Sequence, residues 1–456
     1  MTHVVQLPLW LFILIVLFAA VTFASHFLFP SVRWFFRRRL QKAVTRLNTR
    51  LTRPIEPFKL ARRYDMIQRL IYDPEVTREI VKYAHENGVP ENVGFERARR
   101  YAREIVPSFS AFAYFSFGIR VARWLANALY RVRTGTRDDQ IIQSIPKEAT
   151  VVFIMNHRSN MDYVLVTYLA AQASALSYAV GEWARVWPLS RLIKSMGAYF
   201  IRRRSRGTLY RMVLSRYVQM ATAGGVAQAI FPEGGLSLTG TLMPPKLGLL
   251  TYVLEGYEPD GRDVVFVPVA INYDRVMEDS ILIAAHARGD RRFGARITVV
   301  ARFILRKFWQ WLRGRYTRFG AAAVVFGDPV SLKGLGPEQN VDMLAETLMK
   351  RINAIMPVLF VPLCAAAMRA GGGQLTQAEM HDWVDRQVRL HPQNIPAGEA
   401  EDVGAAIAQA CALMVKRGMI EPVPQGWRIV MTQEATIAYY ANSIAHLIDG
   451  DAAAAL

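Results

Sequence analysis

The chain has 456 residues and a formal net charge of +19, from 56 lysines and arginines against 37 aspartates and glutamates. This excess favours an anionic partner such as a lipid surface, an acidic protein or nucleic acid. The two cysteines, Cys364 and Cys411, are too few for a disulfide framework, and no cluster of residues has metal-ligand spacing. We therefore expect a reduced compartment and no metal.

The first predicted element is an apolar segment near the N-terminus. Residues 7–29 contain no Asp, Glu, Lys or Arg and are longer than the roughly 20 residues that span a bilayer as a helix. Arg33, Arg37 and further basic residues follow it, whereas none precedes it. A cleaved signal peptide would carry positive residues before the apolar stretch. We expect a transmembrane anchor over 1–36, with the bulk of the chain in the cytosol.

Helical patterns flank a different central region. Residues 37–144 are helical in pattern, with breaks near Pro54, Pro74 and Pro90, and we interpret them as one helical domain. Residues 336–456 are again mostly helical, with a short strand expected at 427–431.

Between them, residues 145–335 alternate apolar strands with helical stretches, and the last strand is expected at Ala321–Phe326. Alternation of this kind predicts a mainly parallel or mixed sheet covered by helices. The fold class expected for this domain is therefore α/β.

The most informative residues follow Thr150–Met155, which we predict as a buried strand. His157 comes next and is followed five positions later by Asp162. A histidine beside a carboxylate is a general base with a fixed tautomer. Residues five apart on a continuous helix point about 140° away from each other, so the pair needs a change of course between them. Ser159 or Asn160 can provide it by capping the helix that follows.

Two alternatives weaken the motif taken alone. The same spacing occurs at His446 and Asp451, inside a helical pattern, and we interpret that copy as chance. Asp162 could also simply complement a helix dipole from the first turn.

Three later segments each begin as a short apolar strand and end in polar or glycine-rich residues. They are Gly197–Arg203, Phe231–Ser237 and Val267–Tyr273. An α/β sheet presents such strand ends at one edge, so we expect them to lie near His157. Each segment alone is compatible with an ordinary strand or turn, but their occurrence together and in order favours a functional site.

The four blocks resemble the glycerolipid acyltransferases that carry a histidine and aspartate motif. More narrowly, the chain is similar to the bacterial membrane-bound glycerol-3-phosphate acyltransferases and their dihydroxyacetone-phosphate relatives, a match supported by Arg97–Ile105 and Tyr439–His446. The resemblance covers most of the chain. It implies a glycerolipid acyltransferase domain over 145–335, flanked by helical segments, in a single-pass protein of the inner membrane.

The resemblance also implies residue roles. His157 takes a proton from the acceptor hydroxyl, Asp162 orients the imidazole, and backbone amides of the turn at Glu233 and Gly234 stabilise the oxyanion. The other implied residues bind the substrate or line its channel: Arg158, Ser159, Arg202, Arg203, Gly235, Lys246, Pro268 and Tyr273.

One departure from the family concerns the third block. Leu236 stands where these enzymes usually have arginine, and Leu238 where another basic residue is common. Because leucine cannot bind phosphate, either Arg202, Arg203 or Lys246 supplies the charge, or the acceptor differs from glycerol 3-phosphate.

We expect acyl transfer from acyl-CoA or acyl carrier protein to glycerol 3-phosphate, giving lysophosphatidate, with membrane lipids as partners and no cofactor beyond the donor. The alternative within this class is acylation of lysophosphatidate or another lysolipid. A non-catalytic membrane protein that recruits acyl carrier protein or anionic lipid is the alternative from another class. A winged nucleic-acid reader over Gln374–Met431 would rest only on charge and element order, and we expect no nucleic acid.

Overall fold

The computed structural model describes residues 8–10, 12–17, 38–39, 45–49, 51, 53–135, 138–170, 175–181, 189–202, 207–289, 318–336 and 340–448. Its contacts divide the chain into two units, 1–54 and 55–456. Residues 1–7, 11 and 18–36 of the predicted anchor lie outside the described part. Among the residues that are described, none forms a helix long and apolar enough to cross a membrane.

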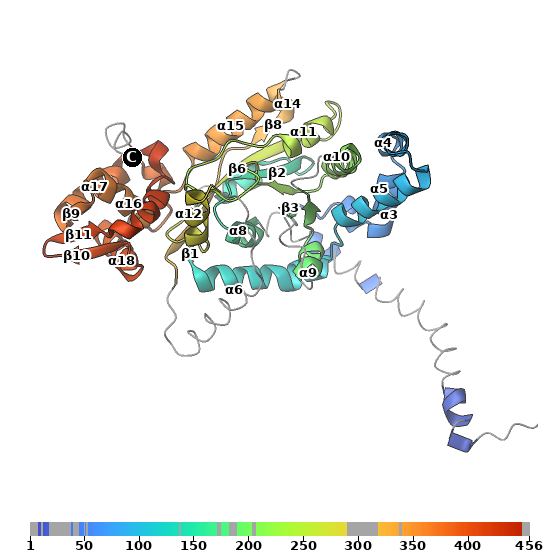
Figure 1. The fold of residues 1–456 in the computed structure, drawn as a ribbon, viewed down its shortest axis with the longest axis horizontal. Helices are drawn as coiled ribbons and strands as arrows, with labels where there is room; N and C mark the ends of the chain where they lie inside the picture. Colours follow the sequence, from blue (N-terminus) through green and yellow to red (C-terminus); the bar gives the residue numbers. More distant parts are fainter. Residues whose placement is uncertain are drawn as a thin grey trace, which may run out of the picture. The chain divides into compact units, whose positions relative to one another are not determined.

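The second unit begins with helices whose starts follow the predicted proline breaks. Pro74 is the first residue of its helix, and Asp73 caps that helix by accepting hydrogen bonds from the amides of Glu75 and Val76. Pro90 is the N-cap of the next helix. The helices of this region are α2 (Pro57–Leu60), α3 (Arg63–Ile71), α4 (Pro74–Glu86), α5 (Glu91–Ile105), the π-helical turn η1 (Ala113–Gly118) and α6 (Ile119–Leu129) (Figure 1).

An eight-stranded mixed sheet forms the centre of this unit, as predicted. Its order is β1-β7-β6-β2-β5-β3-β4, with β8 paired to β6. Along this path only β6 and β7 run antiparallel, and β8 is also antiparallel to β6. The strands are β1 (Arg131–Thr134), β2 (Thr150–Met155), β3 (Ser177–Gly181), β4 (Tyr199–Ile201), β5 (Gln228–Ile230), β6 (Val264–Tyr273), β7 (Ala321–Phe326) and β8 (Val330–Ser331). The predicted bounds of β2 and β7 are confirmed.

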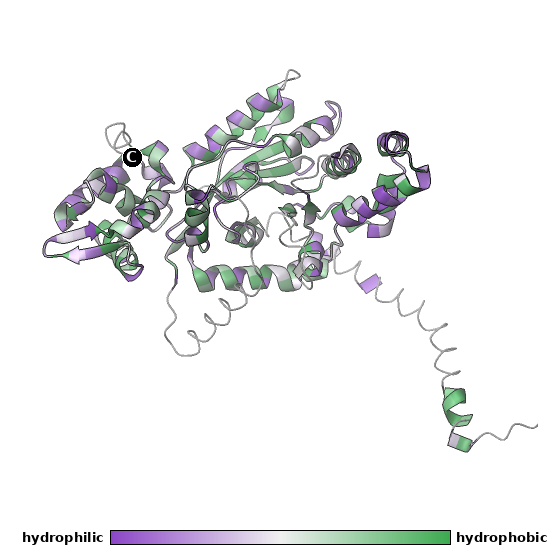
Figure 2. Ribbon diagram, viewed as in Figure 1, coloured by the Kyte–Doolittle hydropathy of each residue, from purple (hydrophilic) through white to green (hydrophobic). Residues whose placement is uncertain are grey.

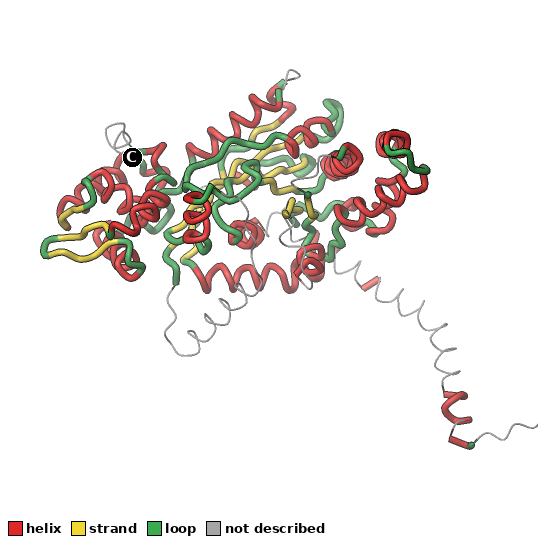
Figure 3. The backbone as a smooth tube through the Cα atoms, viewed as in Figure 1, coloured by secondary structure: helices red, strands yellow, loops and turns green. Residues whose placement is uncertain are grey.

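Helices cover both faces of the sheet (Figures 1 and 3). Val151 and Phe153 of β2 belong to one core cluster with α6 and α8, while Val152 and Ile154 belong to another with α10, α11 and α15. Burial on both faces explains why β2 is an uninterrupted apolar run and colours as hydrophobic in Figure 2. The helices between and after these strands are α7 (Asp138–Ser144), α8 (Met161–Leu169), α9 (Leu189–Ser195), α10 (Thr208–Ala223), α11 (Gly248–Glu255), α12 (Asp279–Ala287), α14 (Leu332–Leu335) and α15 (Val341–Ala354).

The C-terminal region packs its helices around a buried one. In α16 (Phe360–Ala370) nearly every residue is buried, and it packs against α19 (Glu434–Ala441) and α18 (Val403–Lys416). A small antiparallel sheet has the strand order β10 (Ile420–Val423), β11 (Gly426–Ile429), β9 (Gln374–Thr376). Helix α17 (Gln377–Leu390) follows β9 in the sequence. The strand expected at 427–431 is β11. The predicted domain boundaries at 144 and 335 stay predictions.

Candidate active site

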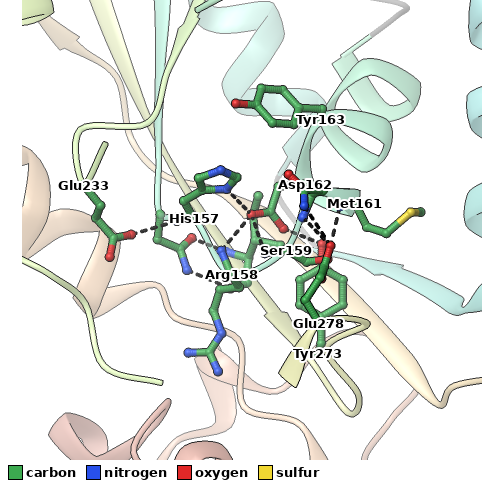
Figure 4. A network of polar contacts seen from close by, with 12 residues as sticks. His157, Arg158, Ser159, Met161, Asp162, Tyr163, Glu233, Tyr273 and Glu278 are labelled. Atoms are coloured by element: carbon green, nitrogen blue, oxygen red, sulfur yellow. Dashed lines mark hydrogen bonds and ion pairs between the residues drawn. The ribbon is translucent and has the colours of Figure 1, made fainter. Parts of the chain in front are cut away.

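The loop between β2 and α8 holds the predicted histidine and aspartate together (Figure 4). Asn156 ends the strand by exchanging two side-chain hydrogen bonds with the backbone of Ile271 on β6, at 2.9 and 2.7 Å. Beyond it, His157 Nδ1 lies 2.9 Å from Asp162 Oδ2, and both side chains are buried. The change of course that the spacing required is therefore present.

The bonds to Asp162 fix the tautomer of His157. Asp162 Oδ2 also accepts hydrogen bonds from the amides of Arg158 (2.7 Å) and Ser159 (3.0 Å), and Oδ1 accepts one from the Tyr273 hydroxyl at 2.5 Å. A carboxylate that accepts these three bonds also serves as the acceptor toward Nδ1, so the imidazole proton lies on Nδ1. Nε2 then carries the lone pair that a general base needs.

Four consecutive backbone amides of this loop donate to three carboxylates. The amide of His157 donates to Glu233 Oε1 at 2.7 Å, those of Arg158 and Ser159 donate to Asp162, and that of Asn160 donates to Glu278 Oε1 at 3.2 Å. Each carboxylate comes from a different element. The backbone of residues 157–160 is thus fixed by three separate carboxylates.

Glu233 was predicted as part of the oxyanion turn, and the structure gives its side chain a different contact. Its second oxygen, Oε2, accepts the amide of Met243 at 2.8 Å, so the buried carboxylate joins the histidine loop to the segment after the turn. Burial raises the pKa of the Glu233 carboxyl to about 7, against the opposing effects of the two amides and Arg158. The amide of Gly234 closes the turn by donating to the carbonyl of Phe231, which leaves the Gly235 amide as the better candidate donor to an oxyanion.

Glu278 is a site residue that the sequence reasoning missed. Its Oε2 accepts the Ser159 hydroxyl at 2.7 Å, and Oε1 accepts both the amide and the side-chain Nδ2 of Asn160. Burial raises the pKa of this carboxyl, and the same bonds act against that shift. Glu278 lies beyond the strand that carries the fourth block, and no local pattern marks it.

The two residues predicted to line a substrate channel, Pro268 and Tyr273, are both buried in the structure. Tyr273 is buried and donates to Asp162, and burial raises the pKa of its hydroxyl well above the usual range, so it stays a donor. Pro268 is buried inside β6, where the partner strands β7 and β8 leave an interval. Its carbonyl accepts the amide of Gly327, and its missing N–H is tolerated at that interval.

The predicted phosphate-binding cations occupy different places. The Arg158 side chain is buried and extends away from the imidazole, donating to the carbonyl of Gly240 and lying over the Tyr439 ring. Arg202 forms a two-bond ion pair with Glu104, at 3.0 and 2.7 Å. Lys246 runs beside the turn, because a Cβ built on Gly234 would lie 2.7 Å from Lys246 Cδ. Gly234 has φ +64°, a conformation that glycine adopts readily.

One predicted arginine remains, together with the two leucines that depart from the family pattern. Arg203 lies outside the described residues. Leu238 is buried in the core cluster that contains α8, and the partly buried Leu236 packs against that cluster.

Two family models match this chain. One, described as acyltransferase, matches residues 137–272, which include β2, β5, most of β6 and the loops with His157 and Glu233. The other, described as glycerol-3-phosphate acyltransferase C-terminal region, matches residues 307–456.

Similar proteins carry related names. The chain is 29% identical over 420 residues to a glycerol-3-phosphate acyltransferase of Aeromonas hydrophila, covering 85% of this chain and 50% of that protein. It is 28% identical over 435 residues to one of Shewanella loihica, covering 87% and 51%. The chain thus spans about half the length of the curated relatives it matches. A solved 1-acyl-sn-glycerophosphate acyltransferase from Thermotoga maritima is 20% identical, with 60% of this chain and 92% of that chain covered and a TM-score of 0.33. The family models and the two curated relatives point the same way, and the chain is similar to glycerol-3-phosphate acyltransferases over most of its length.

Proposed function

We propose that this chain transfers an acyl group from a thioester donor, acyl-CoA or acyl carrier protein, to the hydroxyl of glycerol 3-phosphate. The observation that carries the proposal is the pairing of His157 with a carboxylate that accepts four hydrogen bonds, which leaves Nε2 as a base. The names of the relatives support the acceptor.

The chemistry follows from these positions. Nε2 of His157 takes the hydroxyl proton as the oxygen attacks the thioester carbonyl, and Asp162 stabilises the imidazolium that results. The carbonyl oxygen becomes an oxyanion, and the Gly235 amide is our candidate donor to it. When the intermediate collapses, the carbon–sulfur bond breaks and the thiolate takes the proton back from His157. The products are the ester and the free thiol.

The acceptor phosphate needs a cation near this loop, and we assign that role to Lys246. It runs beside the turn that carries Glu233, whereas Arg158 extends away from the imidazole and Arg202 is paired with Glu104. A lysine binds phosphate as a point charge and does not need the bidentate geometry of arginine.

A second acceptor is favoured by the place of Leu236. This position after the glycine pair holds a leucine that packs against the core, whereas similar enzymes usually have an arginine there. Lysophosphatidate or another lysolipid is therefore the alternative acceptor.

One assay separates these acceptors. Membranes that contain the protein are given a labelled acyl donor with glycerol 3-phosphate in one reaction and lysophosphatidate in the other. Lysophosphatidate formed in the first reaction establishes the proposed step, and phosphatidate formed only in the second establishes the alternative. His157→Ala should lower product formation by about 10²-fold or more, since base catalysis typically contributes that much. His381→Ala, at a half-exposed side chain on α17, is the matched control. Undiminished transfer by His157→Ala would show that the assignment is wrong.

We also propose that residues 7–29 anchor the chain in the inner membrane, with the acyltransferase domain in the cytosol. The apolar segment and the basic residues after it support this orientation. Membrane lipids would then surround the anchor, and the acylated product would enter the same bilayer.

A further inference from the structure

A cavity of about 270 Å³ lies at the edge of the sheet opposite to the candidate active site. Its wall includes Ser177, the first residue of β3, and Val226, which precedes β5. Both strands are parallel to β2, whose other end carries His157. The length of these strands therefore separates the cavity from the candidate active site, and the cavity is not a subsite for the acceptor.

The cavity wall contains a buried lysine. Lys59 is only 9% exposed, and its Nζ donates to the carbonyl of Ala175 at 2.5 Å. The same Nζ lies 4.7 Å from the centre of the Phe109 ring and 5.9 Å from that of Tyr114. Within the described part of the chain, no carboxylate forms an ion pair with it. An ammonium held by a carbonyl and two rings keeps an uncompensated charge, which is costly in a protein interior.

The pKa of Lys59 reflects the same lack of a compensating negative charge. Burial lowers the pKa of the Lys59 ammonium well below its usual range, and desolvation is the only cause. The folded protein thus binds this proton less tightly than the unfolded chain does. A bound anion would supply the missing negative charge and favour the ammonium form of Lys59.

Two arginines increase the positive charge of the wall. Arg62 is exposed at the start of α3, and Arg63 donates to the carbonyls of Val106 and Arg103 at the end of α5. These partners are neutral. The lining contains three cationic residues and, among the described residues that form it, no aspartate or glutamate. Helices α3 and α5 lie side by side in Figure 1.

We propose that this cavity binds a phosphate group. Three cations around one small cavity suit a phosphate, which can carry two negative charges and offers several acceptor oxygens. The volume is too small for a nucleotide-sized ligand but leaves room for a phosphate with a short polar substituent. Such a group can come from a phospholipid headgroup or from a soluble phosphate. A strongly basic stretch, residues 33–53, precedes Lys59 in the sequence. Basic segments attract anionic lipids, which makes a phospholipid headgroup one source of the phosphate.

The test compares Lys59→Met with Lys82→Met in the full-length chain. Lys82 is half-exposed on α4 and pairs with Glu86, so it controls for the loss of one charge. Thermal unfolding in neutral detergent is measured with inorganic phosphate against chloride of equal ionic strength, and in vesicles of phosphatidylcholine with or without phosphatidylglycerol. Any phosphate bound at the acyl-transfer site is common to both variants, so their difference reports this cavity.

The expected result is that Lys59→Met weakens phosphate binding about tenfold or more, while Lys82→Met behaves as the unaltered chain. Without phosphate, Lys59→Met should be at least as stable as Lys82→Met, because it removes a buried charge. Loss of stabilisation by inorganic phosphate identifies a soluble ligand, and loss confined to phosphatidylglycerol vesicles identifies a headgroup. If both variants respond equally in all conditions, the cavity does not bind phosphate. Should Lys59→Met fail to fold, Arg62→Gln at the exposed rim must still weaken the response, and an unchanged response overturns the proposal.

Discussion

Asp162, Glu233 and Glu278 together account for every backbone amide of residues 157–160. A loop whose amides all point to fixed carboxylates has little freedom to move, which is how a general base is kept in register with a substrate. The three carboxylates therefore have distinct tasks. Asp162 also contacts the imidazole, whereas Glu233 and Glu278 bind other groups of the loop and are positioning residues.

Glu278 provides a first test of this division. Glu278→Ala removes the acceptor of the Ser159 hydroxyl and of both Asn160 donors, so we expect kcat to fall by about 10- to 100-fold. KM for the acceptor should change less, because the effect acts through the position of His157. Glu278→Gln can still accept the Asn160 bonds and should restore most of the rate. Steady-state kinetics measures this, with Glu258→Ala at an exposed position as the control. A Glu278→Ala enzyme with normal kcat would contradict a positioning role.

Glu233 makes stability depend on pH. Its pKa is raised from 4.5 in the reference state to about 7 in the folded chain, so the folded state binds the proton more tightly. The stability from this group is fully present below about pH 4.5 and is lost as pH rises through about 7. Glu233→Gln cannot titrate. The stability of the unaltered chain minus that of the variant should therefore fall across this window, by a few kcal/mol at most, since one unit is about 1.4 kcal/mol. Thermal unfolding over a pH series measures the difference, and a constant difference would exclude the shift.

At the scale of elements, the strands and the loop were predictable to different degrees. Bounds such as Thr150–Met155 followed from the sequence because a strand buried on both faces is an apolar run with polar ends. The pairing of His157 with Asp162 followed from the change of course between strand and helix. The bond from Tyr273 to Asp162 did not, because it depends on the register of β6 against β2, which no local pattern specifies. Glu278 was missed for the same reason.

Helix α19 supports the segment that carries Glu278. The Tyr440 hydroxyl accepts the amide of Val276 at 3.0 Å and donates to Asp279 at 2.6 Å, and Arg417 of the turn after α18 also donates to Asp279. The residues on both sides of Glu278 are therefore fixed by the C-terminal region. This contact gives the region matched by the second family model a structural connection to the site.

Two neighbouring tyrosines allow a matched test of that connection. Tyr440→Phe leaves the buried amide of Val276 without its acceptor and should destabilise the chain by about 1–3 kcal/mol. Tyr439→Phe removes a buried hydroxyl that has no hydrogen-bond partner within the described residues, and it should be nearly neutral. Thermal unfolding compares the two, and kcat should fall only with Tyr440→Phe. Equal effects of both variants would mean that α19 supports the site through packing alone.

At the scale of the whole molecule, the division after Pro54 separates two properties that can be measured independently. Every described residue of the candidate site belongs to the unit 55–456, whereas the apolar segment proposed as the anchor belongs to the unit 1–54. A protein without its anchor would retain only the attraction between its basic surface and anionic lipid, which salt screens. A spanning helix is insensitive to salt.

We therefore expect a chain that begins at Ile55 to keep acyl transfer in detergent micelles but to leave the membrane fraction in high salt, where the full chain stays. Fractionation at low and high salt, followed by activity in each fraction, measures both properties. The His157→Ala variant of the full chain is the control, since it should remain in the membrane and be inactive. If the shortened chain resists high salt, a surface of the second unit enters the membrane. In that case an apolar contact within 55–456 holds the protein at the bilayer.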